Sequence, residues 1–136
     1  MKVKSLFKAI LVCLIYLLAV SFQSAGPLTG VWEYAGGIYH GQADPPPRDI
    51  KLQRVYTETG YQGFIIKKGS KNVKYEAGKY ALSNNFYRET PTYSNQSSPL
   101  KGIMLHYTYT IHNNVFIYKG KLPDKTSVEE HWKRIK

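Results

Sequence analysis

The stretch Gly102–His112, GIMLHYTYTIH, decides the fold class of this chain. Its odd positions carry Ile, Leu, Tyr, Tyr and Ile, whereas its even positions after the glycine carry Met, His, Thr, Thr and His. A side-chain period of two, with one apolar and one polar face, is typical of a half-buried β-strand. Asn113-Asn114 follows, and asparagine tolerates the left-handed backbone of a tight hairpin turn. Val115–Leu122 is therefore predicted as the partner strand.

Similar runs cover the rest of the chain from Gly30 onward, separated by turn residues. They are rich in Val, Ile, Tyr, Phe and Thr, and none has a sustained helical period. The candidate strands are Gly30–Tyr34, Ile50–Thr57, Gln62–Lys68, Val73–Leu82, Asn85–Thr90, Gly102–His112, Val115–Leu122 and Thr126–Ile135. Short strands at such close spacing predict an all-β fold, either an up-and-down antiparallel barrel or a sandwich. A barrel has the advantage that it leaves no sheet edge exposed.

Two segments do not fit the strand pattern. Ala35–Asp49 contains paired glycines and Pro45-Pro46-Pro47, and prolines have no amide hydrogen to donate to a sheet. A loop of about fifteen residues in so small a domain is often functional, so Gly36–Asp49 is predicted to act as a lid. Pro91–Pro99 is predicted as a second, polar loop.

Residues 1–25 have the pattern of a secretory signal peptide. Three lysines precede the apolar run Ala9–Val20, whose 12 residues are fewer than the roughly 20 that a membrane-spanning helix needs. Small residues suit cleavage after Ser21, whereas cleavage after Ala25 places a larger glutamine at the third position back. We therefore expect a secreted or periplasmic protein with one domain, residues 26–136; an uncleaved membrane anchor is the alternative.

The composition narrows the classes of function. The single cysteine, Cys13, lies within the apolar run, so the exported domain is expected to contain no disulfide, thiol nucleophile or cysteine-ligated metal. The four histidines have no metal-binding spacing, and we expect neither a metal nor a cofactor. The formal charge of +10 falls to +7 without residues 1–25. Export argues against nucleic acid as the partner of this basic chain.

Gly30-Val31-Trp32 opens the first strand, and Arg134 lies near the end of the last one. A Gly-x-Trp of this kind is a hallmark of lipocalins and related calycin barrels, in which a basic side chain from the last strand packs over the indole. The resemblance therefore implies that Arg134, or alternatively Lys133, packs on Trp32. The chain resembles the small, functionally uncharacterised, lipocalin-like secreted proteins of Bacteroidetes-type bacteria. The other segments that carry this resemblance are the proline-rich loop, Gly78–Leu82, Tyr87–Glu89, Leu100–Gly102 and Glu129–Arg134. The resemblance implies an eight- to ten-stranded barrel with an internal cavity.

Alternation along the strands selects candidate polar ligand-binding residues. Glu130, Trp132 and Arg134 share one face of the last strand, and Tyr87 shares a face with Glu89. Buried carboxylates are rare unless they are paired. A cluster that holds the polar head of a ligand is therefore predicted from Tyr87, Glu89, Glu130 and Arg134. One alternative is a structural ion pair that closes the barrel end. Another is an outward-facing Trp132, in which case there is no cluster.

Apolar and aromatic residues complete the predicted site. The side chains expected to line or close the cavity are Trp32, Tyr56, Phe64, Ile66, Tyr107, Tyr109 and Trp132. Apolar walls with a few polar groups are typical of small-molecule sites, so we expect an exported binding protein for a small apolar or amphiphilic ligand. No catalytic motif accompanies the two carboxylates, and we expect no enzymatic activity.

The alternative function is a surface interaction module on the cell envelope. Five lysines lie around one predicted hairpin, at positions 67, 68, 71, 74 and 79. Together with exposed members of the twelve tyrosines, the Lys67–Lys79 hairpin would bind glycan, anionic lipid or a protein partner. A solvated face without a partner is the simpler interpretation of these lysines. The sequence gives no information on the oligomeric state.

Overall fold

The computed structural model describes residues 26–136, which form nine β-strands. These are β1 (Gly30–Tyr39), β2 (Gln42–Asp44), β3 (Lys51–Tyr56), β4 (Gly60–Ile66), β5 (Val73–Leu82), β6 (Phe86–Ser94), β7 (Leu105–His112), β8 (Val115–Lys121) and β9 (Ser127–Arg134). Within this part of the chain, no helix is long and apolar enough to cross a membrane. The expected signal peptide and Cys13 lie outside the described residues.

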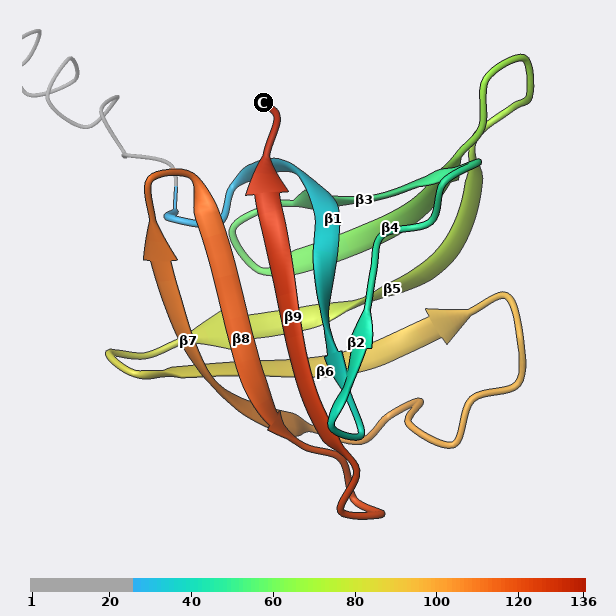
Figure 1. The fold of residues 1–136 in the computed structure, drawn as a ribbon. Helices are drawn as coiled ribbons and strands as arrows, with labels where there is room; N and C mark the ends of the chain where they lie inside the picture. Colours follow the sequence, from blue (N-terminus) through green and yellow to red (C-terminus); the bar gives the residue numbers. More distant parts are fainter. Residues whose placement is uncertain (1–25) are drawn as a thin grey trace, which may run out of the picture.

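Antiparallel pairing closes the sheet into a barrel (Figure 1). Strands β3 to β9 pair in sequence order, and β1 pairs with β3 on one side and with β9 on the other. Eight strands thus form a closed up-and-down barrel, and β2 is an additional short strand beside β1. The sequence prediction of an all-β antiparallel barrel is confirmed.

The asparagine turn after β7 has the predicted geometry. Asn113 and Asn114 have φ angles of 49° and 59°, and His112 pairs directly with Val115. Two consecutive left-handed residues match the right-handed twist of the flanking strands, which is why such turns favour asparagine. The hairpin prediction for β7 and β8 is therefore confirmed.

The predicted lid loop begins at Pro45 rather than at Ala35. Residues 37–39 pair with residues 42–44 and form a hairpin. The paired glycines allow close strand approach instead of ending the strand, because a Cβ at Gly37 would collide with the carbonyl oxygen of Glu129 on β9. A β-bulge between Tyr34 and the next paired residue accommodates the change of register.

The other predicted loop is also shorter than expected. Pro91 belongs to β6, where a register shift between Ala77 and Gly78 of β5 accommodates the missing amide hydrogen. On the far side of the loop, β7 begins at Leu105, so the first residues of the predicted strand belong to the connection. Gly102 has a φ of 82°, which a strand does not allow.

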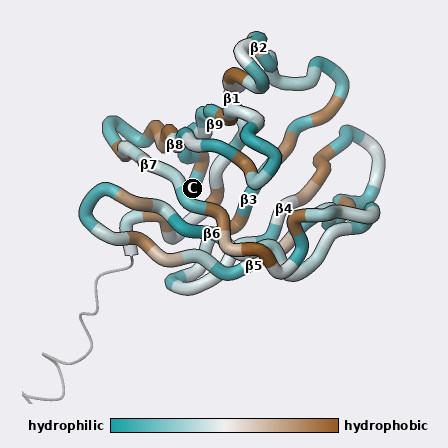
Figure 2. Tube along the Cα trace, turned by 90° about the horizontal axis from the view of Figure 1, so that it is seen from below, coloured by the Kyte–Doolittle hydropathy of each residue, from teal (hydrophilic) through white to brown (hydrophobic). Residues whose placement is uncertain are grey.

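The core consists mainly of aromatic side chains that point into the barrel. Inward and outward residues alternate along strands such as β7, and Figure 2 shows hydrophobic and hydrophilic residues interspersed along the chain. The largest fully buried side chains are Trp32, Trp132, Tyr56, Tyr87, Tyr118, Phe116 and Leu28. Their rings contact one another, for example Tyr87 and Phe116 with centroids 5.2 Å apart and planes at 86°. Edge-to-face contacts of this kind add about 0.5–1.5 kcal/mol to the effect of burial.

Candidate functional site

One end of the barrel is closed by Trp32, at the start of β1. The indole nitrogen of Trp32 donates a hydrogen bond to the Leu28 carbonyl at 2.8 Å. The Arg134 guanidinium carbon lies 4.3 Å from the centroid of the indole ring. Arg134 also donates to the carbonyl oxygens of Thr29 and Pro27, both at 2.6 Å. We call this arrangement the closed end; it has the predicted cation–π contact.

Arg134 is therefore not part of the predicted polar cluster, and the prediction is wrong on this point. Its register partner on β1 is Trp32, which places it at the closed end. The cation that faces Glu89 is instead Arg54 of β3, which the sequence analysis did not name. The sequence contained the information to predict Arg54, because Arg54 is two residues before Tyr56 and therefore lies on the same inward face of the strand.

Arg54 lies at the centre of a buried polar network. Its Nε atom is 2.6 Å from Glu76 Oε1, and its Nη1 atom is 3.2 Å from Glu89 Oε2. Nη1 also donates to the hydroxyls of Tyr56 and Tyr118, at 3.1 and 3.3 Å. Arg54 is only 4% exposed, so these contacts replace hydration that the guanidinium has lost.

Tyrosine hydroxyls connect the carboxylates to this arginine. Tyr87 donates to Glu89 at 2.6 Å, and its hydroxyl oxygen is 3.1 Å from that of Tyr56. Tyr118 donates to Glu130, which also accepts a hydrogen bond from the Trp132 indole at 2.9 Å. Trp132 thus points inward, as the predicted polar cluster required, and the alternative of an outward-facing Trp132 does not hold. The central cluster comprises Arg54, Glu76, Glu89, Glu130, Tyr56, Tyr87 and Tyr118.

Burial controls the protonation of the central cluster. Burial raises the pKa of Glu89 above its usual value, although Arg54 opposes the shift. Burial likewise raises the pKa of the Tyr87 hydroxyl, and the Glu89 charge adds to the effect. Burial alone would lower the pKa of Arg54, but its partners, Glu76 first among them, raise it well above the usual value. Within the central cluster, burial therefore favours the protonated form of Glu89.

Most of the predicted lining residues form packed core. Trp32, Tyr56, Tyr87, Tyr107 and Trp132 are all buried. Tyr107 stacks on Tyr87 with ring centroids 6.0 Å apart and an interplanar angle of 24°. The rings fill the space beside the closed end, which the sequence analysis had assigned to a ligand. The remaining aromatic candidate, Tyr109, is half-buried, and its hydroxyl donates to the Ser83 carbonyl at 2.9 Å.

Phe64 and Ile66 do not line the interior, so their prediction as lining residues is wrong. They alternate along β4 with Tyr61 and Gly63, which are buried. Phe64 pairs with Gln53, whose side chain binds Glu33 on the outer surface. Because facing residues of adjacent strands point to the same side, Phe64 and Ile66 lie on the outer face. Apolar character alone could not distinguish the two faces of this strand.

An apolar pocket of about 460 Å³ lies at the opposite end of the barrel. We call it the mouth pocket. The β1–β2 hairpin, the β6–β7 connection and the β8–β9 turn meet there (Figure 1). Its lining residues are Tyr39, Pro99, Leu100, Ile103, Leu122, Pro123 and Asp124. Leu100 and Leu122 also pack against the core, so the pocket has a firmly held floor.

The mouth pocket was not predicted because most of its residues lie outside the predicted strands; only Ile103 and Leu122 fall within them. The single charged side chain there is Asp124, which accepts a hydrogen bond from the Thr126 amide at 2.9 Å. This hydrogen bond lowers the pKa of Asp124 and keeps its carboxylate charged. The available signal was the apolar character of Leu100, Ile103 and Leu122 beside prolines.

Within residues 26–136, no three His, Cys, Asp or Glu side chains are arranged to hold a metal ion. Comparison of the sequence with protein-family models and with curated proteins finds no match. The closed eight-stranded antiparallel barrel is compatible with a lipocalin-like fold.

Proposed function

We propose that this protein is a non-catalytic binding protein for a small apolar or amphiphilic molecule, held in the mouth pocket. The observation that carries this proposal is an apolar pocket of about 460 Å³ at the barrel mouth with one carboxylate, Asp124, among its lining residues. Ligand sites in proteins typically measure about 300–1,000 Å³ and combine apolar walls with a few polar groups. Apolar atoms of the ligand would contact Leu100, Ile103 and Leu122, while a polar group would remain near Asp124.

The rigid neighbourhood of the mouth pocket supports a preformed site. Leu100 and Leu122 rest on the aromatic core. The backbone at Leu122 is also held in place, because its amide donates a hydrogen bond to the Thr126 carbonyl at 2.9 Å. Side chains and backbone that are already ordered lose little entropy on binding. In this proposal the central cluster stabilises the fold and does not bind the ligand. This corresponds to the alternative of a structural ion pair.

Membership of the lipocalin-like family and export from the cytoplasm belong to the same proposal. Support for the family comes from the Gly-x-Trp of β1 and from Arg134, which lies 4.3 Å from the Trp32 ring centroid. Support for export comes from the lysines and the apolar run Ala9–Val20 near the start of the sequence. Export would place the mouth pocket where envelope lipids and their breakdown products are available.

Native mass spectrometry of the purified protein tests the proposal, with N-phenyl-1-naphthylamine as a neutral apolar probe. We expect a co-purified small molecule or saturable probe binding, and Ile103→Arg should abolish it because the charge enters the pocket. Val73→Arg is the matched control, since Val73 is 49% and Ile103 is 40% exposed. Unchanged binding by Ile103→Arg, or no binding by the wild type, would overturn the proposal.

The lysine hairpin supports a second candidate function, as an anionic-surface binding module. Residues 67–74 are exposed throughout, and the Lys74 ammonium lies 4.8 Å from the ring centroid of Tyr93. Co-sedimentation with vesicles of phosphatidylglycerol, compared with vesicles of phosphatidylcholine, tests it. Binding to the anionic vesicles that is lost in K67A/K68A would support this function, and the absence of binding would exclude it.

A further inference from the structure

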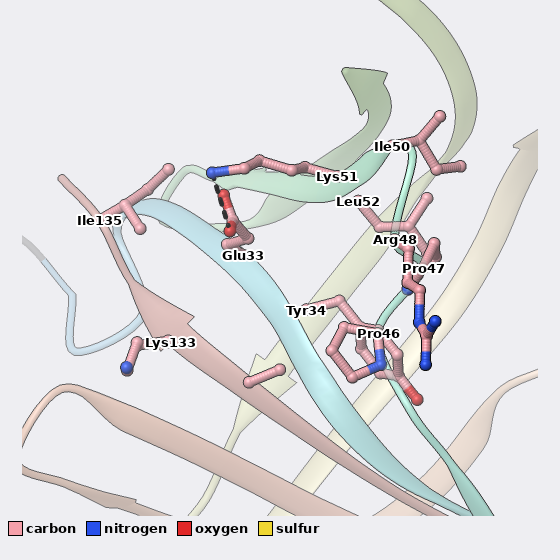
Figure 3. Close-up of a pocket in the computed structure, with 11 residues that line it drawn as sticks. Glu33, Tyr34, Pro46, Pro47, Arg48, Ile50, Lys51, Leu52, Lys133 and Ile135 are labelled. Atoms are coloured by element: carbon pink, nitrogen blue, oxygen red, sulfur yellow. Dashed lines mark ion pairs between the residues drawn. The ribbon is translucent and has the colours of Figure 1, made fainter. Parts of the chain in front are cut away.

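A second pocket lies on the outside of the barrel, under the segment that the sequence analysis predicted to be a lid (Figure 3). We call it the outer pocket; its volume is about 370 Å³. One side consists of Lys133 of β9 and Ile135, which follows β9, and the other of Pro46, Pro47, Arg48, Ile50, Lys51 and Leu52. Figure 3 shows Glu33 and Lys51 side by side between these two sides. The proposed function does not use this pocket.

The outer pocket has an excess of positive charge. Arg48, Lys51 and Lys133 line it, together with a single carboxylate, Glu33. Both oxygens of Glu33 are already engaged: Oε1 is 3.4 Å from Lys51 Nζ, and Oε2 accepts a hydrogen bond from Gln53 at 3.0 Å. Among residues 26–136, neither Arg48 nor Lys133 has an ion-pair partner. Two positive charges therefore remain available to an anion.

The remaining walls are apolar and are held in place by the backbone. Pro46, Pro47, Ile50 and Ile135 supply them. Proline has a fixed φ angle, so the segment loses little freedom when a ligand binds. Gly36 lets this segment lie against β1, because a Cβ there would be only 3.3 Å from both Pro46 Cδ and the Asp44 carbonyl oxygen.

The segment is also anchored where it leaves the sheet. Tyr34 donates a hydrogen bond from its hydroxyl to Asp44 Oδ2 at 2.7 Å, directly before the three prolines. This bond and the close approach at Gly36 fix the wall before any ligand arrives. The proline-rich segment is thus the fixed side of a pocket rather than a lid over the barrel.

We propose that the outer pocket binds a small organic anion, in which a carboxylate or phosphate group is joined to an apolar ring or short chain. Arg48 presents a planar guanidinium that fits either oxyanion, and Lys133 adds a second positive charge. The apolar part of the ligand packs against Pro46, Pro47 and Ile135. This site is separate from the mouth pocket, so either proposal can fail without the other.

Chemical-shift titration of the full chain tests this inference, with phenyl phosphate and benzoate as probes. We expect saturable shifts at the amides of Ala35, Arg48, Lys51 and Ile135. Inorganic phosphate, which lacks the ring, and benzyl alcohol, which lacks the charge, should each bind about tenfold more weakly, since each retains only one kind of contact. A preference for phenyl phosphate over benzoate, or the reverse, identifies the oxyanion.

Paired charge variants distinguish a built site from general attraction to a basic protein. R48A/K133A should weaken phenyl phosphate binding by about tenfold or more, because both free cations are lost. K119A/K121A removes the same charge from β8, which does not line the outer pocket, and should leave the affinity unchanged. Equal weakening in both variants, shifts confined to other residues, or wild-type affinity in R48A/K133A would overturn the inference. The spectra themselves report whether each variant is folded.

Discussion

The closed end and the mouth of the barrel use similar residue types in opposite ways. At the closed end, Trp32 and Leu28 are 0% exposed, and Arg134 bonds to the backbone that precedes β1. At the mouth, Tyr39 is 51% exposed and Ile103 is 40% exposed. Apolar side chains that are exposed together around a pocket are typical of an interaction site. Under the proposed function, stability resides at the closed end and in the central cluster, and binding belongs to the mouth.

Loss of Arg54 is the strongest test of the structural half of this comparison. Arg54→Leu would leave Glu89 buried without its cation, and removal of one partner of a buried ion pair typically costs about 3–5 kcal/mol. Urea unfolding should show this loss in the free energy of unfolding. R54L/E89L removes the Arg54–Glu89 pair and leaves only Glu76 without its cation, so it should be less destabilised than R54L. A loss below about 1 kcal/mol in R54L would show that the cluster is solvated rather than structural.

Removal of the closed-end cation should have a smaller effect. Arg134→Ala deletes the cation–π contact with Trp32 and the two hydrogen bonds to Thr29 and Pro27. We expect a loss of about 1–3 kcal/mol in the free energy of unfolding, with binding to N-phenyl-1-naphthylamine unchanged. Arg88→Ala, at an exposed position of β6, is the control and should change neither quantity. Loss of probe binding in R134A would indicate that the ligand binds at the closed end and would contradict binding in the mouth pocket.

The protonation of Glu89 predicts how the stability of the central cluster depends on pH. The pKa of Glu89 is raised in the folded state, so folding favours its protonated form. Its contribution to stability is fully present below the ordinary glutamate pKa and is lost as the pH rises through the raised value. Relative to Glu89→Gln, which cannot ionise, the wild type should therefore lose stability as the pH increases from 4 to 8. Each unit of pKa shift corresponds to about 1.4 kcal/mol.

Urea unfolding of both proteins across this pH range gives the difference directly. Glutamine is similar in shape to glutamate, so other titrating groups contribute equally to the two proteins and cancel. A difference that stays constant with pH would mean that Glu89 has its ordinary pKa. A wild type that gains stability relative to E89Q would mean that Arg54 outweighs burial.

The smallest effect on stability is expected at the mouth. Ile103→Ser shortens an exposed side chain in the β6–β7 connection, and such surface changes usually alter the free energy of unfolding by less than about 0.5 kcal/mol. Probe binding in the mouth pocket should nevertheless weaken several-fold, because one apolar wall is lost. A large loss of stability in I103S would indicate that the connection is part of the core, and the contrast between the two ends would disappear.

Alternation predicted the strands because it is a local property of each strand, whereas the resemblance to lipocalin-like proteins favoured a barrel over a sandwich. The asparagine turn and the Gly-x-Trp with Arg134 behave as expected, and the predicted strand Gly102–His112 is a strand from Leu105 onward. Gly36 and Gly37 were interpreted as loop residues. Their lack of a side chain is needed because Pro46 lies close to Gly36 and Glu129 lies close to Gly37, and both neighbours are remote in sequence. A one-dimensional pattern contains no information on such contacts.

The candidate site was harder to predict for a related reason. Tyr87, Glu89 and Glu130 do belong to one network, as their alternation suggested, but its cation comes from β3 rather than from β9. Whether the barrel interior is open or filled depends on how the rings from many strands interlock, which no single strand reveals. The mouth pocket is formed by three connections that meet only in the folded protein.

A crystal structure of the protein with N-phenyl-1-naphthylamine, or with its co-purified molecule, tests the central claim most directly. We expect ligand density between Tyr39, Leu100 and Leu122, with the Tyr56 and Tyr87 rings unmoved and Arg54 still bonded to Glu89. Density inside the barrel beside Tyr56 and Tyr87, with those rings displaced, would contradict the account. It would show that the aromatic core opens for the ligand and that the mouth is only its entrance.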